Sequence, residues 1–210
     1  MAVYLTIPLF FSLLIYTLVY LAIEPVVNAG VAVASMVIAR ETPNFLEDLT
    51  TIYQDKNLVE RSSIPLSEVV IPYIGTHYAN LSVERLGVTT PVYFGDSDRI
   101  LLAGAGQYSG SFLPGFKRPI LISGHNLSVF NYLQYLTVGD KISLKTNYGL
   151  YIYEVTGIAI HNATDPAAID LGKQEEELIL YTCYPFQRLS SRKYDRWFVY
   201  AKRISGPDVK

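Results

Sequence analysis

The chain contains one cysteine and three histidines, so few of its side chains suit nucleophilic or acid–base chemistry. Cys183 follows the apolar run 178–182 and precedes Pro185. Because proline ends ladder pairing, we expect the thiol at the rim of a sheet and not in its middle. A thiolate there could attack a carbonyl carbon. The alternative is a structural cysteine, since a lone thiol also packs as a small apolar group.

His125 stands in a similar place, directly after the apolar segment 119–123 and Gly124. Working residues often lie where a strand ends, and an imidazole there could protonate a leaving amine. A packed or surface histidine is the alternative. His77 and His161 lie in polar turn or loop sequences, and we expect both at the surface.

Arg196 opens the last aromatic and apolar segment, after a polar loop over residues 186–195. A guanidinium close to a thiol could stabilise the negative oxygen of a tetrahedral intermediate. Arg188 and Arg192 are rivals for that role, but both lie within the loop. We therefore favour Arg196, which starts a strand.

These three side chains must be positioned by a β-rich domain. Short apolar runs alternate with glycine, proline and asparagine, which is typical of strands. We expect strands at Val69–Ile74, Tyr78–Arg85, Thr90–Phe94, Pro119–Ser123, Lys141–Thr146, Leu150–His161, Glu177–Cys183 and Arg196–Lys202. One short helix is expected at Val129–Leu136, with Ser128 as a possible N-cap. Eight strands and little helix predict a mostly β fold, an antiparallel barrel or sandwich.

The first 39 residues differ from this domain, because Glu24 is their only charge. About 20 apolar residues cross a bilayer as a helix, so residues 4–23 predict one transmembrane helix. Residues 26–39 are a shorter apolar continuation. We expect residues 1–39 to anchor the chain in a lipid bilayer; a buried core helix is the alternative.

The remaining boundaries follow from composition. We expect a helix and linker over 40–65, the barrel over 66–205 and a tail over 206–210. The nearly neutral domain disfavours nucleic acid as a partner. A single cysteine excludes a disulfide within the chain, and Glu175–Glu177 is expected to be a solvated hairpin rim. No cofactor or metal site is expected.

Three motifs in order resemble the sortase family: Ser123-Gly-His-Asn126, Tyr181-Thr-Cys-Tyr-Pro-Phe186 and the segment that begins at Arg196. The Thr-Cys-Tyr-Pro-Phe form is most similar to class D sortases. The segments 90–95 and 106–110 also resemble parts of the sortase barrel, and the likeness covers about residues 70–203. The resemblance implies a closed β-barrel of about eight strands.

The resemblance also implies a cysteine transpeptidase at the outer side of the cell membrane of a Gram-positive organism. Cys183 would cleave a Leu-Pro-x-Thr sorting signal on a surface protein and form an acyl-thioester. An amine of the peptidoglycan precursor or stem peptide would then resolve it. His125 would be the acid and base, Arg196 would stabilise the oxyanion, and Thr182 and Tyr184 would contact the substrate.

Two other functions remain open from the sequence. A membrane-anchored cysteine hydrolase would use the same Cys–His pair with water as the acceptor. A noncatalytic surface β-domain would keep Cys183 as a core residue. A pilin-polymerising type is disfavoured, because we find no Asp-Pro-aromatic lid before the barrel and no second apolar segment after it.

Overall fold

The computed structural model describes residues 6–7, 9–20, 22–23, 49–186 and 194–210. The chain divides into two units, an N-terminal one and a barrel domain. In the first, the described residues are helical and their side chains are exposed. None of the helices within the described ranges is both long and apolar enough to span a membrane. The apolar continuation expected at 26–39 lies outside the described residues.

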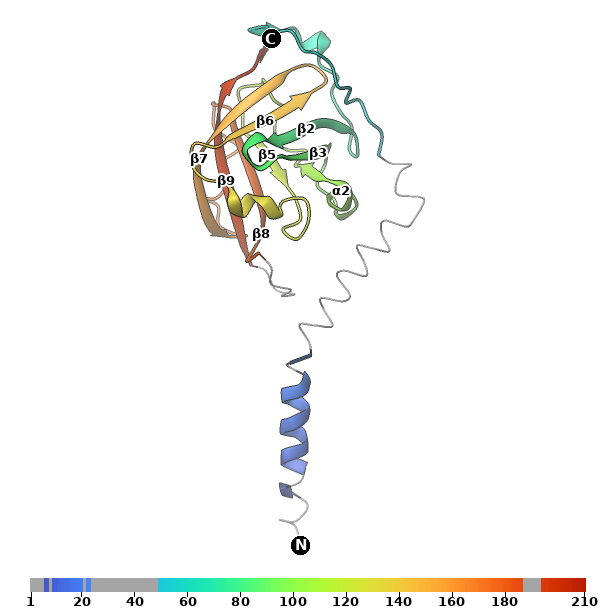
Figure 1. Cartoon of the computed structure of the whole chain (residues 1–210), viewed down its shortest axis with the longest axis vertical. Coiled ribbons are helices and arrows are strands. Elements are labelled where there is room, and N and C mark those ends of the chain that lie inside the picture. Colours follow the sequence, from blue (N-terminus) through green and yellow to red (C-terminus); the bar gives the residue numbers. More distant parts are fainter. Residues whose placement is uncertain (1–5, 8, 21, 24–48, 187–193) are drawn as a thin grey trace. The chain divides into compact units, whose positions relative to one another are not determined.

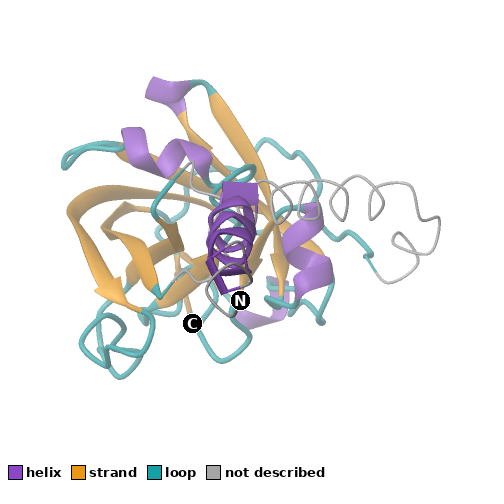
Figure 2. Ribbon diagram, turned by 90° about the horizontal axis from the view of Figure 1, so that it is seen from below, coloured by secondary structure: helices purple, strands orange, loops and turns teal. Residues whose placement is uncertain are grey.

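The second unit is a closed barrel in which the strands are paired in the order β2-β3-β4-β5-β8-β9-β7-β6 (Figure 1). The bounds are β2 His77–Val83, β3 Val88–Phe94, β4 Ala105–Gln107, β5 Ile120–Ser123, β6 Lys141–Thr146, β7 Leu150–Asn162, β8 Glu177–Tyr184 and β9 Asp195–Ser205. The helical elements are α2 Asp98–Ala103 and the 3₁₀ turns η2 Leu66–Glu68, η3 Glu84–Leu86 and η4 Asn131–Tyr135. Figure 2 shows how small this helical share is beside the strands. The prediction of a mostly β, closed eight-stranded barrel is confirmed.

Side-chain alternation explains the barrel core. Along β7, Tyr151, Tyr153 and Val155 are buried, whereas the residues between them are more exposed. Successive strand residues point to opposite faces, so each strand gives every second side chain to the interior. Leu180 of β8 and Val199 of β9 join the same core.

A second, smaller core lies on the other face of three neighbouring strands. Leu121 of β5, Ile179 of β8 and Phe198 of β9 pack with Ala168 from the loop after β7. These strands are therefore covered on both faces over part of their length. That double packing fixes the positions of their ends, where the candidate residues lie.

Two pairs of strands are parallel, β3 with β4 and β5 with β8, although the sequence favoured an antiparallel arrangement. The β5–β8 pair matters most. Ile120 pairs with Leu178 and Ser123 with Tyr181, so both strands run toward the same rim. Parallel neighbours bring two strand ends together, although 58 residues separate Ser123 from Tyr181 in the sequence.

The strand expected at 69–74 is absent. Pro72 lacks an amide donor, and no ladder pairing forms here; Val69 and Pro72 are buried, whereas Val70, Ile71 and Tyr73 are exposed. The eighth strand is instead β4, whose three residues are buried. Its sequence, Ala105-Gly-Gln107, is too short and too rich in small residues for its pattern to predict a strand.

The helix expected at 129–136 is a 3₁₀ helix over 131–135. Phe130 occupies its N-cap position without a side-chain hydrogen bond, so the expected cap at Ser128 is wrong. The chain turns just before this 3₁₀ helix. There the carbonyl of His125 accepts hydrogen bonds from the amides of Ser128 and Phe130.

Both ends of the barrel domain also depart from expectation. Residues 49–62 contain no helix, and the rest of the helix expected there lies outside the described residues. The expected tail contains β10, Asp208–Val209, which pairs in parallel with β1, Ser63–Ile64. The amide of Leu66 donates to the carbonyl of Lys210 at 2.7 Å, so residues 206–210 are part of the fold.

The acidic run at 175–177 was expected to be solvated, and Glu175 is exposed, but Glu176 departs from that expectation. Glu176 is buried, and its carboxylate accepts hydrogen bonds from the amides of Gly115 and Lys117 and from the hydroxyl of Tyr153 at 2.7 Å. Arg203 Nη1 lies 3.1 Å from Glu176 Oε2, and Asp208 bridges Arg203 and Lys117. The far-end cluster is the name used below for Lys117, Tyr153, Glu176, Arg203 and Asp208.

Candidate active site

Strand pairing brings the three candidate residues close together at one rim of the barrel. Cys183 of β8 is the direct antiparallel partner of Arg196 of β9. On the other side of β8, Ser123 pairs with Tyr181, and His125 follows Ser123 by the two residues that separate Cys183 from Tyr181. Cys183 and Arg196 therefore share one row across β8 and β9, and His125 lies two residues past the end of β5, next to β8; these three residues are called the row below.

Cys183 and Arg196 also share a face of the sheet. Directly opposed residues of an antiparallel pair project on the same side, with Cβ atoms about 4.5–5.5 Å apart. Both lie on the outer face, because residues two positions away, Tyr181 and Phe198, stack there with ring centroids 5.5 Å apart. Cys183 and Arg196 are both partly exposed, so reagents reach this rim.

Three hydrogen bonds tie the turn of His125 to the strand of Cys183. The Gly124 amide donates to the Tyr181 carbonyl at 3.3 Å. The Thr182 hydroxyl donates to the Gly124 carbonyl at 2.6 Å, and the Asn126 side chain donates to the Pro185 carbonyl at 3.1 Å. These bonds lie on both sides of the histidine and of the cysteine, so they restrict the separation of the two residues.

Gly124 is required by close approach. A Cβ atom at this position would lie 2.8 Å from the ring carbons of Phe130, which is fully buried and cannot move aside. The glycine therefore lets the turn of His125 pack directly on the core. A larger residue would displace the imidazole from its row.

The neighbourhood of the thiol carries both aromatic and charged groups. Burial raises the pKa of Tyr181, which also interacts with Ser123, Asp96, Arg196 and Cys183, so its hydroxyl stays protonated at neutral pH. Arg196 Nη1 donates to the carbonyl of Asp195 at 3.0 Å.

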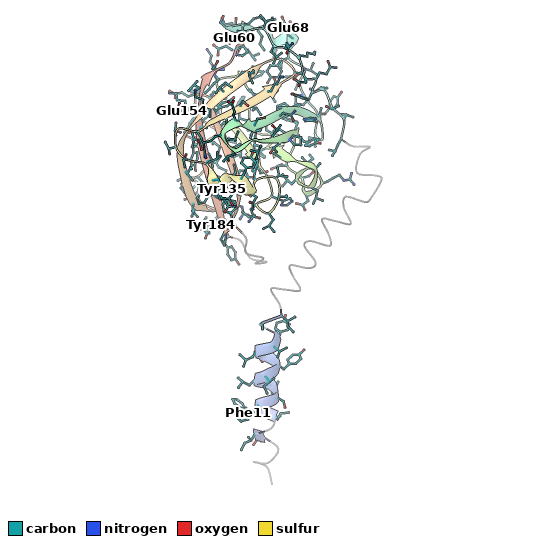
Figure 3. The ribbon with its side chains drawn as sticks, viewed as in Figure 1. Phe11, Glu60, Glu68, Tyr135, Glu154 and Tyr184 are labelled. Carbon is teal, nitrogen blue, oxygen red and sulfur yellow. The ribbon has the colours of Figure 1, made fainter. Side chains whose placement is uncertain are left out.

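Thr182 and Tyr184, expected to contact substrate, lie on the other face of β8. Thr182 is 2% exposed, and it pairs with Trp197 across the sheet. Tyr184 stacks on Trp197 with centroids 5.8 Å apart, at the end of β8 marked in Figure 3. Thr182 thus holds the histidine turn, and substrate contact through either residue remains a prediction.

The remaining candidates are placed as follows. Arg188 and Arg192, the rivals of Arg196, lie outside the described residues. His77 is held between the rings of Tyr53 and Tyr93. His161, expected at the surface, is only 26% exposed in its side chain and contacts Asp165.

Within the described part of the chain, no group of three or more histidine, cysteine, aspartate or glutamate side chains could hold a metal ion. The row of His125, Cys183 and Arg196 instead combines a nucleophile, a proton carrier and an anion stabiliser. That set suits acyl transfer through a thioester.

Comparison with known proteins shows the family of the chain. Residues 81–204, more than half of the chain, match the family model described as the sortase domain. The chain belongs to the sortase family. Membership implies cysteine transpeptidase activity. Over 134 residues the chain is 32% identical to Sortase D of Bacillus subtilis (strain 168), covering 64% of this chain and 67% of the relative.

Solved sortases share the fold. A sortase D5 transpeptidase of Clostridium perfringens matches with a TM-score of 0.57 and 26% identity, over 64% of this chain and 83% of that one. A sortase E variant of Streptomyces avermitilis matches with a TM-score of 0.55 and 24% identity, over 64% of this chain and 91% of that one. The second match supports the fold only.

Sequence reasoning missed several residues around the site. Asn126 lay inside a quoted motif, but its bond to the Pro185 carbonyl depends on the β5–β8 pairing. Tyr181 and Phe198 could have been found by counting two residues from Cys183 and from Arg196, because strand residues alternate between faces. The position of His161 beside Arg196 depends on register alone, although its contact with Asp165 is local, four residues along the chain.

Proposed function

We propose that this sortase is a membrane-anchored cysteine transpeptidase that joins surface proteins with a Leu-Pro-x-Thr-type sorting signal to a cell-wall amine. The observations that carry the proposal are the direct pairing of Cys183 with Arg196 and the hydrogen bonds that hold the turn of His125 against β8. Sortase membership supports the reaction class.

In the proposed first step, the Cys183 thiolate attacks the carbonyl carbon of the signal's threonine. An S–C bond forms, and the negative oxygen of the tetrahedral intermediate is stabilised by the Arg196 guanidinium. The C–N bond then breaks, and His125 gives its proton to the leaving amine. The products are the acyl-thioester and the free C-terminal fragment.

In the proposed second step, an amine of the peptidoglycan precursor or stem peptide attacks the thioester carbonyl. His125 takes the proton of the incoming amine, the new C–N bond forms and the C–S bond breaks. The thiolate of Cys183 is restored, so the cycle needs no cofactor. If water replaced the amine, the same residues would hydrolyse the signal.

The membrane anchor is part of this proposal. Helical residues of the N-terminal unit expose apolar side chains in every direction, which is typical of a helix surrounded by lipid. The residues concerned are Ile7, Leu9, Phe10, Phe11, Leu13, Leu14, Ile15, Leu18, Val19 and Ile23. Carbonate extraction should leave the full chain in the membrane fraction, whereas Leu13→Lys with Leu18→Lys should release it. A full chain that is extracted before any substitution would refute the anchor.

The reaction is tested by mass spectrometry of the intact protein mixed with Leu-Pro-x-Thr-Gly and Leu-Pro-x-Thr-Ala peptides. We expect an adduct on Cys183 with the mass of the acyl fragment, which a small amine removes as a peptide–amine product. Hydrolysis alone in excess amine would favour the hydrolase. Full activity of Cys183→Ala with no adduct would favour the noncatalytic domain.

A further inference from the structure

A second histidine is paired with a carboxylate beside the row of the site. Nδ1 of His161, near the end of β7, lies 2.8 Å from Oδ2 of Asp165. The other oxygen of Asp165 accepts a hydrogen bond from the Ala167 amide at 2.9 Å. These two bonds, that of His161 first, hold the pKa of Asp165 below its ordinary value, so the carboxylate is charged at neutral pH.

The strand register places this pair next to Arg196. His161 is the direct antiparallel partner of Arg196 in the β7–β9 ladder. Arg196 is in turn the direct partner of Cys183 in the β8–β9 ladder. The guanidinium residue is therefore flanked by the thiol residue on one side and by the imidazole residue on the other.

Ring contacts put His161 on the outer face with the other two. Its imidazole meets the ring of Phe198 edge to face, with centroids 5.7 Å apart. Phe198 stacks on Tyr181, which marks the face of Cys183. The Ala163 amide donates to the Tyr194 carbonyl at 2.7 Å, so the β7–β9 pairing is held beyond His161.

The chemistry of the pair leaves one imidazole nitrogen for Arg196. A charged carboxylate only accepts hydrogen bonds, so Nδ1 of His161 carries the proton that faces Asp165. In the tautomer that carries its proton on Nδ1, Nε2 is an acceptor, and arginine has only donors. An imidazole fixed through Nδ1 presents Nε2 in a defined orientation.

We propose that His161, held by Asp165, is a positioning residue that orients the Arg196 guanidinium toward Cys183. The inference rests on the proposed function, because it assigns Arg196 to the oxyanion. His161 accepts a guanidinium N–H through Nε2 and restricts the rotamers of Arg196. Asp165 fixes the ring and its tautomer and adds a negative charge that favours the cation nearby.

Two substitutions separate the nitrogens of His161. In His161→Asn the amide can still donate to Asp165 but has no atom at the place of Nε2. In His161→Gln the longer side chain carries an acceptor oxygen to that place. Since a hydrogen bond to a charged group contributes roughly tenfold in rate, we expect His161→Asn to lower kcat for thioester formation about tenfold with KM unchanged. His161→Gln should stay within about threefold.

A double-mutant cycle tests whether the effect passes through Arg196. In an Arg196→Ala background, His161→Asn should have no further effect on thioester formation. Equal losses in both backgrounds would overturn the proposal, as would a loss confined to the amine step. Far-UV circular dichroism and the melting temperature show whether each variant folds; if His161→Asn does not, Asp165→Asn replaces it in the cycle.

A substrate-free measurement keeps this inference distinct from the proposed function. The rate at which iodoacetamide alkylates Cys183 should fall several-fold in Arg196→Ala, because a nearby cation favours the thiolate. His161→Asn should lower that rate too, but not in the Arg196→Ala background. An alkylation rate that Arg196→Ala leaves unchanged would overturn the positioning role. Absence of any peptide adduct on the wild-type chain would refute the transpeptidase alone.

Discussion

The two ends of the barrel handle polar groups in opposite ways. At the end of β8 that carries Cys183, the functional side chains are partly exposed and are held by bonds from neighbouring residues to main-chain carbonyls. At the other end, the charges of the far-end cluster are paired with one another, with Glu176 and Arg203 largely buried and Lys117 at the exposed edge. Figure 3 marks these ends with Tyr184 on one and Glu60 and Glu68 on the other.

The difference shows how one fold separates chemistry from stability. A buried ion pair costs desolvation and is strongly destabilised when one partner is removed. A reactive rim needs groups that solvent and substrate can reach, and rigid support from groups that they cannot. The barrel keeps its costly charges at the far end, so the rim near Cys183 can be altered without loss of the fold.

The largest effect is expected from Cys183→Ala. Thioester formation with sorting peptides should fall below detection, because no other thiol exists in the chain. The melting temperature should change little, since Cys183 is partly exposed and free. Mass spectrometry and a thermal scan measure the two quantities, with Cys183→Ser as the near-isosteric control. A large drop in melting temperature would contradict the division between the ends.

Glu176→Ala should have the opposite effect, lowering the stability and leaving the activity of the folded protein unchanged. It leaves Arg203 buried without its carboxylate, and removing one partner of such a pair costs about 3–5 kcal/mol of unfolding free energy. Urea unfolding measures this loss. Activity per folded molecule at low temperature should be retained. Glu175→Gln is the control, because that side chain is 79% exposed and should change the unfolding free energy very little.

Thr182→Val should lower both the stability of the fold and the activity. It removes the 2.6 Å bond to the Gly124 carbonyl, whose unmet acceptor costs about 1–3 kcal/mol. Because Gly124 precedes His125, kcat should also fall, by about tenfold. Thr182→Ser, which keeps the hydroxyl, is the matched control and should restore the activity. Equal activity of the valine and serine variants would show that this bond does not position the histidine.

The smallest effect is a loss of stability in acid. Lys117 and then Arg203 hold the pKa of Asp208 below its ordinary value, and Arg85 lowers that of Asp140 to about 2. A lowered carboxylate pKa stabilises the fold above the unfolded pKa of about 4, and that contribution is lost as the pH falls toward about 2.

The melting temperature should therefore decline between about pH 5 and pH 2, and Asp208→Asn should make the decline shallower. Glu60→Gln, at an exposed position, is the control. An unchanged slope in Asp208→Asn would mean that the far-end cluster does not contribute to acid sensitivity.

Much of the fold was predictable from periodicity. The strands at 141–146 and 177–184 were found because their alternation or apolar content survives without tertiary context. β4 was missed because three small residues carry no pattern, and α2 because six residues give too few turns to show one. The segment at 69–74 was apolar, but it pairs with no strand, and four of its six side chains are exposed.

The candidate residues came from local sequence signals, and their arrangement depends on strand pairing that the sequence did not show. Cys183, His125 and Arg196 each stood at the end of an apolar run, a local signal. Their common row depends on the parallel β5–β8 pairing, which links residues far apart in sequence. Glu176 and His161 were misjudged for a similar reason. The partners of Glu176 include Tyr153 and Arg203 on other strands, and His161 pairs with Arg196 on β9, so only Asp165 is a local neighbour.

The place of β8 between β5 and β9 also bears on how the enzyme reaches its working state. Hairpins such as β2–β3 and β6–β7 join neighbouring segments and can form early, whereas the β5–β8 contact must close a long loop. The row of His125, Cys183 and Arg196 is thus complete only when β8 pairs with both β5 and β9 and closes the barrel. In a nascent or partly folded chain, Cys183 is not yet next to His125 and Arg196. Activity therefore requires that the barrel has finished folding.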